Sequence, residues 1–110
     1  GKYWAIVRDA SEFQMSGPMV GTLALSTGLI EDHCGVSIVW SDDSRFIAVP
    51  KLFPEKPEFR VLIIRVADGI RRYAPGRMGP LALSAFRDQR LTIIRNDSVE
   101  EIDLSFVRWQ

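Results

Sequence analysis

The sequence predicts an all-β domain of antiparallel strands that form a curved sheet or a two-sheet sandwich. Apolar and polar residues alternate with a period of two, and turn signals return at intervals of roughly eight to twelve residues. Helix signals are almost absent. A chain of 110 residues is the length of one domain and long enough to bury a core, so we expect residues 1–110 to form a single domain.

The N-terminal part is expected to hold two strands. Residues 2–8 are apolar on both faces, which predicts a strand that is central or covered. Residues 9–18 are polar and end in Ser16-Gly17-Pro18, which predicts a loop. Strand alternation resumes at residues 20–26, whereas residues 28–35 fit either a short strand end or a turn.

The run VWSDDSRFIAVP, residues 39–50, predicts a hairpin. The expected strands are 36–40 and 46–53, and Ser41-Asp42-Asp43-Ser44 supplies the turn because Asp and Ser side chains bond nearby backbone amides. Pro50 has no amide to donate to a neighbouring strand. We therefore expect the second strand to lie at a sheet edge or to end near Pro50.

The C-terminal half is expected to hold five strands. Residues 59–67 contain the run Val61-Leu62-Ile63-Ile64, apolar on both faces, which predicts the central strand. Asp68-Gly69 predicts a tight hairpin into residues 70–74, because glycine supplies the positive φ that such turns need. Strands at 81–86, 91–95 and 99–106 follow, joined by short polar turns. The predicted core is Trp4, Ile6, Leu23, Leu25, Ile38, Trp40, Ile47, Val49, Leu62, Ile64, Leu83, Ile93, Ile102, Leu104 and Phe106.

The stretch WSDDSRFIAV, residues 40–49, resembles the inner hairpin of a β-propeller blade, and residues 60–69 look like the next blade strand with its turn. Blades run to about 40–50 residues and closed propellers need at least four, so this chain cannot close one alone. It is a fragment, a subunit that closes by oligomerising, or an independent small sheet protein. We favour the last, because the proline-rich loops do not follow a repeat spacing.

The same hairpin is similar to that of small bacterial immunity proteins of contact-dependent or polymorphic toxin systems. The resemblance implies that the chain binds and neutralises a cognate toxin. It carries no site residue over to this chain.

Motifs for catalysis or metal binding are weak. His33 and Cys34 would point to opposite faces of an extended strand, which opposes a nucleophile and base pair. Glu31 and Asp32 beside them could contribute to a metal site, but no second ligand cluster stands at zinc spacing. Asp42 and Asp43 fit turn stabilisation better than catalysis. We therefore expect a non-enzymatic chain with no catalytic residues, metal or cofactor.

Charge is unevenly distributed although the net charge is zero. Residues 60–96 carry eight arginines, no lysine and two acids, a net charge of +6. Such a block fits recognition of carboxylates or phosphates, and nucleic-acid binding is one alternative function. The pI near 6.8 and the scarcity of aromatic residues in the block make this alternative less favoured. Pairing of these arginines with acids on neighbouring strands is the interpretation we prefer.

The preferred function is therefore protein binding, with a toxin domain as the expected partner. Arginine, tyrosine and methionine are enriched at protein interfaces, which selects a set of candidate contact residues: Arg45, Phe53, Arg71, Arg72, Tyr73, Arg77 and Met78. No apolar run is long enough for a membrane span. A single cysteine fits a reducing compartment, which favours the cytoplasm. Because the chain starts at Gly1, a preceding signal peptide stays an open alternative.

Overall fold

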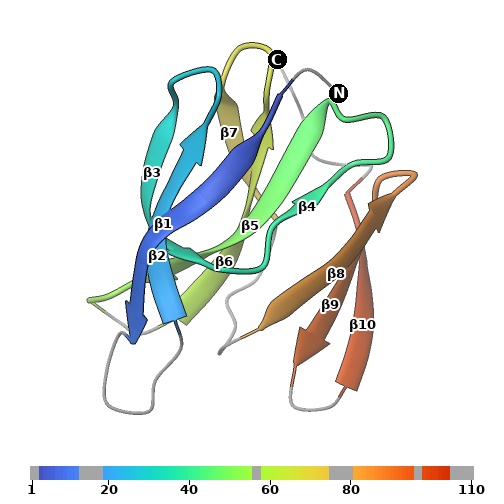
Figure 1. The fold of residues 1–110 in the computed structure, drawn as a ribbon. Helices are drawn as coiled ribbons and strands as arrows, with labels where there is room; N and C mark the ends of the chain where they lie inside the picture. Colours follow the sequence, from blue (N-terminus) through green and yellow to red (C-terminus); the bar gives the residue numbers. More distant parts are fainter. Residues whose placement is uncertain (1–2, 13–18, 56–57, 75–80, 96–97, 105–110) are drawn as a thin grey trace.

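A computed structural model describes residues 3–12, 19–55, 58–74, 81–95 and 98–104, and these form two antiparallel sheets (Figure 1). The larger sheet has seven strands in the order β1-β2-β3-β5-β6-β7, with β4 paired to β5. The smaller has the order β10-β9-β8 and lies to the right of the larger sheet in Figure 1. The all-β antiparallel prediction is confirmed.

Ten strands make up these sheets, and their bounds agree with most of the predicted ranges. They are β1 (Ala5–Glu12), β2 (Met19–Leu25), β3 (Ile30–Gly35), β4 (Val39–Trp40), β5 (Phe46–Phe53), β6 (Glu58–Arg65), β7 (Ile70–Tyr73), β8 (Ala82–Arg87), β9 (Arg90–Arg95) and β10 (Ser98–Asp103). The ambiguous segment 28–35 thus contains a strand. The described part of the chain contains no helix long and apolar enough to cross a membrane.

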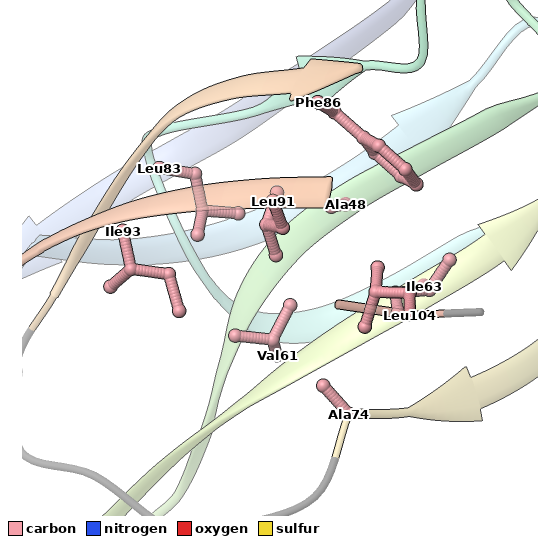
Figure 2. Close-up of a cluster of buried hydrophobic side chains, with 9 residues drawn as sticks. All are labelled: Ala48, Val61, Ile63, Ala74, Leu83, Phe86, Leu91, Ile93 and Leu104. Carbon is pink, nitrogen blue, oxygen red and sulfur yellow. The ribbon is translucent and has the colours of Figure 1, made fainter. Parts of the chain in front are cut away.

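Strands β5 and β6 form a layer that is buried on both faces. One face carries Ala48, Val61 and Ile63, which meet side chains of β8 and β9 such as Leu91 in a first core cluster (Figure 2). Burial of each apolar face stabilises the fold by about 25 cal/mol for every Å² of apolar surface removed from water. The small sheet is held to the large one mainly by this cluster.

The opposite face of the same layer carries Ile47, Val49, Leu62 and Ile64. These pack against Leu23 and Leu25 of β2, so the large sheet curls until β1 to β3 cover β5 and β6. Residues 61–64 lie in an interior strand, because β6 pairs with β5 on one side and β7 on the other, but β6 stands next to the end of the sheet order rather than at its centre.

The curl begins at bulges on both sides of β2. Asp9 and Ala10 of β1 together oppose Gly21, and Asp9 has a φ of 57°. A β-bulge of this kind bends its strand and increases the local twist. The backbone of β1 comes so close that a Cβ on Gly21 would meet the Arg8 carbonyl oxygen, so only glycine fits here. The predicted loop over 9–18 is wrong in its first part, because β1 extends to Glu12.

The hairpin predicted at residues 39–50 is present as β4 and β5. Val39 pairs with Ala48 and Trp40 with Ile47, although β4 is shorter than the predicted strand 36–40. In the turn, the Asp43 carboxylate accepts hydrogen bonds from the Ser41 hydroxyl (2.7 Å) and from the backbone amide of Arg45 (3.1 Å). The Ser41 hydroxyl in turn accepts from the amide of Phe46, which closes the turn.

Pro50 neither ends β5 nor marks an edge, contrary to the prediction. The N–H and C=O of Phe46 both bond to Ser41, so by two-residue alternation the Pro50 nitrogen faces the same side. On that side β5 changes partner, from β4 at Ala48 to β3 at Lys51. The N–H that proline lacks would therefore point to the junction between β4 and β3, where no inter-strand hydrogen bond is required.

Nine of the fifteen predicted core residues are buried, and the clearest departure is at the N-terminal strand. Trp4, just before β1, and Ile6 in β1 are 57% and 46% exposed, because they lie on the outer face of a strand that, among the described strands, pairs only with β2. Their inner-face neighbours Ala5 and Val7 pack on the second cluster instead. Ile38, Trp40 and Ile102 are half-buried, and Phe106 lies outside the described residues.

Candidate functional site

The predicted contact residues do not form one site. Phe53 and Tyr73 have their rings 5.8 Å apart, and Arg71 lies on the same face of β7 as Tyr73. Arg72 lies on the opposite face of β7, and Arg45 is at the other end of β5 from Phe53. At about 3.3 Å per residue, the length of β5 places Arg45 more than about 20 Å from Phe53. Arg77 and Met78 lie outside the described residues.

Arg60 completes the group around Tyr73. Its guanidinium carbon lies 4.6 Å from the centre of the Tyr73 ring, a cation–π geometry. Arg60 pairs opposite Lys51 across β5 and β6, and Leu62 pairs opposite Tyr73, so both side chains share one face of the sheet. We call Phe53, Arg60 and Tyr73 the aromatic–arginine cluster.

The Arg60 guanidinium has no carboxylate partner within the described residues, and its Nε is buried without a hydrogen-bond acceptor. Arginine presents several donors in a fixed planar array, and a buried donor without an acceptor is costly. This side chain is therefore positioned by the aromatic ring but not neutralised.

Beside the cluster lies a buried cation with two carboxylate partners. Lys51 is only 7% exposed, and its Nζ donates to Glu31 Oε2 and Asp32 Oδ1, each at 2.7 Å. Arg71 donates from Nε to the other carboxylate oxygen of Glu31 at 2.7 Å. We call Glu31, Asp32, Lys51 and Arg71 the lysine network. It joins β3, β5 and β7 at one end of the second core cluster.

A second bulge explains how two consecutive acids reach one lysine. In a regular strand Glu31 and Asp32 would point to opposite faces. Here Asp32 and His33 together oppose a single residue of β2, and His33 has a φ of 53°. Histidine and aspartate enter this left-handed region more readily than most residues. The bulge turns both carboxylates, and the Asp32 carbonyl, toward Lys51.

Electrostatics in the network follow from these bonds. Burial on its own would lower the pKa of the Lys51 ammonium, but its hydrogen bonds to Asp32 and Glu31 outweigh burial and raise that pKa. The hydrogen bond from Lys51 and its charge lower the pKa of the Asp32 carboxyl. Burial raises the pKa of the Tyr73 hydroxyl, and the negative charge of Glu31 adds to this effect. Lys51 and Asp32 are therefore both charged at neutral pH.

Cys34 is placed for packing. It is completely buried in the second core cluster, and its thiol donates toward the carbonyl oxygens of Glu31 and Asp32. Burial raises the pKa of this thiol to about 12, so almost no thiolate exists near pH 7. His33 is exposed and lies 3.5 Å from Asp32. Within the described ranges, no three or more His, Cys, Asp or Glu side chains are grouped to hold a metal ion.

Among the described residues, four of the eight arginines of the block are paired with acids, so the pairing preferred from the sequence is confirmed in part. Arg65 bonds Asp68 and Arg71 bonds Glu31, each at 2.7 Å. On the small sheet, Arg95 bonds Glu100 at 2.7 Å and Arg90 lies 3.7 Å from Glu101. The pairs are spread over both sheets, so the basic block of the sequence is not one basic face of the fold.

Sequence reasoning missed Arg60, Lys51 and Glu31 as members of the site. Arg60 could have been found from its place in the two-residue alternation, because it shares a face with Leu62. Lys51 had no such signal. A lysine is rarely buried unless it is paired, and the partners depend on a bulge that the sequence did not reveal.

No protein-family model, curated protein or solved structure matches this chain.

Proposed function

We propose that this chain is a non-enzymatic protein-binding module whose contact surface is the aromatic–arginine cluster with Arg71 beside it. The observation that carries the proposal is the Arg60 guanidinium, which is stacked on Tyr73 and has no carboxylate partner among the described residues. A partner that supplies a carboxylate would pair with the charge of this guanidinium.

The surroundings of Arg60 favour binding. Tyrosine and arginine dominate the energetics of protein interfaces, particularly where a rigid surface holds them. Here Tyr73 is held by Phe53 and by the strand pairing of β7, and Lys51 and Glu31 fix the adjoining strands. Little side-chain freedom remains to be lost on binding, which lowers the entropic cost of association.

The finer proposal is that the partner is a toxin domain and that the chain is its immunity protein, expected in the cytoplasm. Its support is the resemblance of the hairpin at residues 40–49. On this proposal the toxin surface offers an acidic side chain to Arg60. Electrostatic complementarity then depends on this one contact and does not require the immunity protein to be acidic as a whole.

Two other functions have less support. Nucleic-acid binding needs a continuous basic face, whereas Arg65, Arg71, Arg90 and Arg95 are each engaged by an acid. A β-propeller fragment remains an alternative for the hairpin, but no observation favours it over an independent domain.

The test is co-expression with the product of the neighbouring coding sequence, followed by titration of the purified pair. Arg60→Ala should weaken the complex about 30-fold or more, which corresponds to an interface residue worth at least about 2 kcal/mol. Protection of cells from the neighbour's toxicity should fall in parallel.

Arg95→Ala is the matched control, because it removes an exposed arginine from the small sheet, and its affinity should equal that of the wild type. Thermal unfolding of Arg60→Ala checks that the fold is kept. The proposal fails if the two variants bind equally well. Formation of no complex with the neighbour would reject the immunity function, and retention of oligonucleotides with a steep salt dependence would favour nucleic acid instead.

A further inference from the structure

Strand β1 is an edge strand with apolar side chains on both faces. Ala5 and Val7 pack inward on the second core cluster, while Trp4 and Ile6 project outward and are about half exposed. Ile6 pairs with Ala24, and Ala24 pairs with Ile30, which is 51% exposed. An apolar row therefore crosses the outer face of β1, β2 and β3.

The backbone of β1 also has an open side. The Trp4 amide donates to the Ser26 hydroxyl and the Trp4 carbonyl accepts from the Ser26 amide, so both groups face β2. By alternation, the N–H and C=O groups of Ala5 and Val7 face away from β2. Among the described strands only β2 pairs with β1, and such an unpaired edge is a template for another strand.

We propose that this edge pairs with the same edge of a second copy of the chain, antiparallel about a two-fold axis at Ile6. The interface would be isologous, as in most homodimers. In this register Ala5 and the partner's Val7 exchange both backbone hydrogen bonds, and Ile6 faces the partner's Ile6. The two seven-stranded sheets become one continuous sheet.

Self-pairing in this register places an aromatic side chain opposite a cationic one. Trp4 stands opposite the partner's Arg8, so each indole receives a guanidinium and no two like charges oppose each other. The net charge of the chain is zero, so long-range repulsion does not oppose association of two copies. The bulge at Asp9 ends the regular edge and limits pairing to the residues before it.

The aromatic–arginine cluster contributes nothing to this contact. Its residues come from β5, β6 and β7, and none of these strands pairs with β1. Dimer formation and partner binding are therefore separable, and failure of one leaves the other standing.

Sedimentation equilibrium measures the assembly, and disulfide trapping measures the register. The mass should rise from 12.5 kDa toward twice that value as protein concentration increases. Ile6→Cys should give a disulfide-linked dimer under mild oxidation, because the two Ile6 positions form a non-hydrogen-bonded pair with Cα atoms about 4.5 Å apart. The native Cys34 is completely buried, so it does not compete.

Ile30→Cys is the matched control, since it is equally exposed on the same face but two strands from the edge. It should remain largely uncrosslinked. Ala5→Pro removes an amide that faces outward, so it should keep the fold, checked by circular dichroism, and abolish the dimer. A monomeric wild type at every concentration, equal trapping of Ile6→Cys and Ile30→Cys, or a folded Ala5→Pro that still dimerises would each overturn the proposal.

Discussion

At the scale of single residues, Lys51 is a charged side chain held in a buried position. A lysine is buried only where partners offset the loss of hydration, and here two carboxylates and a carbonyl supply them. Loss of the ammonium would leave Glu31 at a site that is itself mostly buried. The network is thus sensitive to removal of its central cation.

We predict that Lys51→Ala lowers the free energy of unfolding by about 3 kcal/mol, near the lower end for a broken buried pair because Asp32 is largely exposed. Urea unfolding at neutral pH measures the loss. Arg95→Ala, which breaks an exposed pair, should cost less than about 1 kcal/mol. Similar losses in the two variants would contradict the importance of burial.

The ion pair of Lys51 with Asp32 predicts that the free energy of unfolding depends on pH. The folded state lowers the pKa of Asp32 below its ordinary value of 3.8, so its contribution to stability is present above that value. It is lost as the pH falls through the lower, folded-state pKa. The difference in stability between wild type and Lys51→Met should therefore shrink as unfolding is measured at progressively more acidic pH below 3.8, and a constant difference would argue against Asp32 as a partner.

At the scale of strands, the bulges beside β2 set the curvature of the large sheet. Both use a non-glycine residue with positive φ, Asp9 in β1 and His33 in β3. Between them Gly21 allows the closest backbone approach. The bulge at His33 also orients the acids of the lysine network, so one irregularity of β3 both bends the sheet and places the carboxylates of the site.

We predict that Gly21→Ala lowers the free energy of unfolding by about 2 to 3 kcal/mol. The added Cβ would lie 3.0 Å from Ala10 Cα and 2.9 Å from Val7 Cγ1, and closer still to the Arg8 carbonyl oxygen. Because these include backbone atoms, the contacts cannot be relieved by a side-chain rotation. Chemical unfolding monitored by circular dichroism measures the change.

Gly28→Ala separates steric crowding from backbone strain. A Cβ on Gly28 would meet nothing within 4 Å, but its φ of +98° is unfavourable for alanine. We expect Gly28→Ala to lower the free energy of unfolding by only about 1 to 2 kcal/mol. A neutral Gly21→Ala would show that β1 and β2 do not approach as closely as described.

Strand assignments could largely be predicted from sequence because they depend on local alternation and turn residues. The hairpin at residues 39–50 and the buried strand at 61–64 are examples, and both are present. Pairing order is less local. Trp4 and Ile6 are predicted in the core because nothing in their own segment shows that β1 lies at an edge. Pro50 predicts a sheet edge because the sequence does not show that β5 changes its partner strand there.

The site could be predicted only in part, for a similar reason. Phe53, Tyr73 and Arg71 were selected for residue type, and they meet because their strands are neighbours. Arg45 and Arg72 have the same residue type as Arg71 but lie elsewhere. The β3 bulge, which has no strong sequence signal, brings Glu31 and Asp32 to the site.

At the scale of the whole molecule, one layer serves two cores. Leu62 and Ile63 are consecutive in β6, fully buried, and face opposite clusters. Neither sheet has a core independent of this layer, because the small sheet packs on the same strands. The molecule should therefore unfold as one unit.

We predict that Leu62→Ala and Ile63→Ala each cost about 3 kcal/mol, the usual range for truncating a buried aliphatic side chain. In both variants, unfolding followed by circular dichroism and by tryptophan fluorescence should give coincident transitions. Separate transitions in Ile63→Ala would mean that the small sheet detaches first, which would contradict a single cooperative domain.

The order of strands in the two sheets also bears on how the chain reaches this fold. Pairing follows the chain order, with only the short β4 passed over between β3 and β5. Each new strand therefore joins one that has just formed, and the loops that must be closed are short. Since loop-closure entropy and the separation of contacts along the chain slow folding, we expect this all-β chain to fold faster than sandwiches of similar length with Greek-key crossovers.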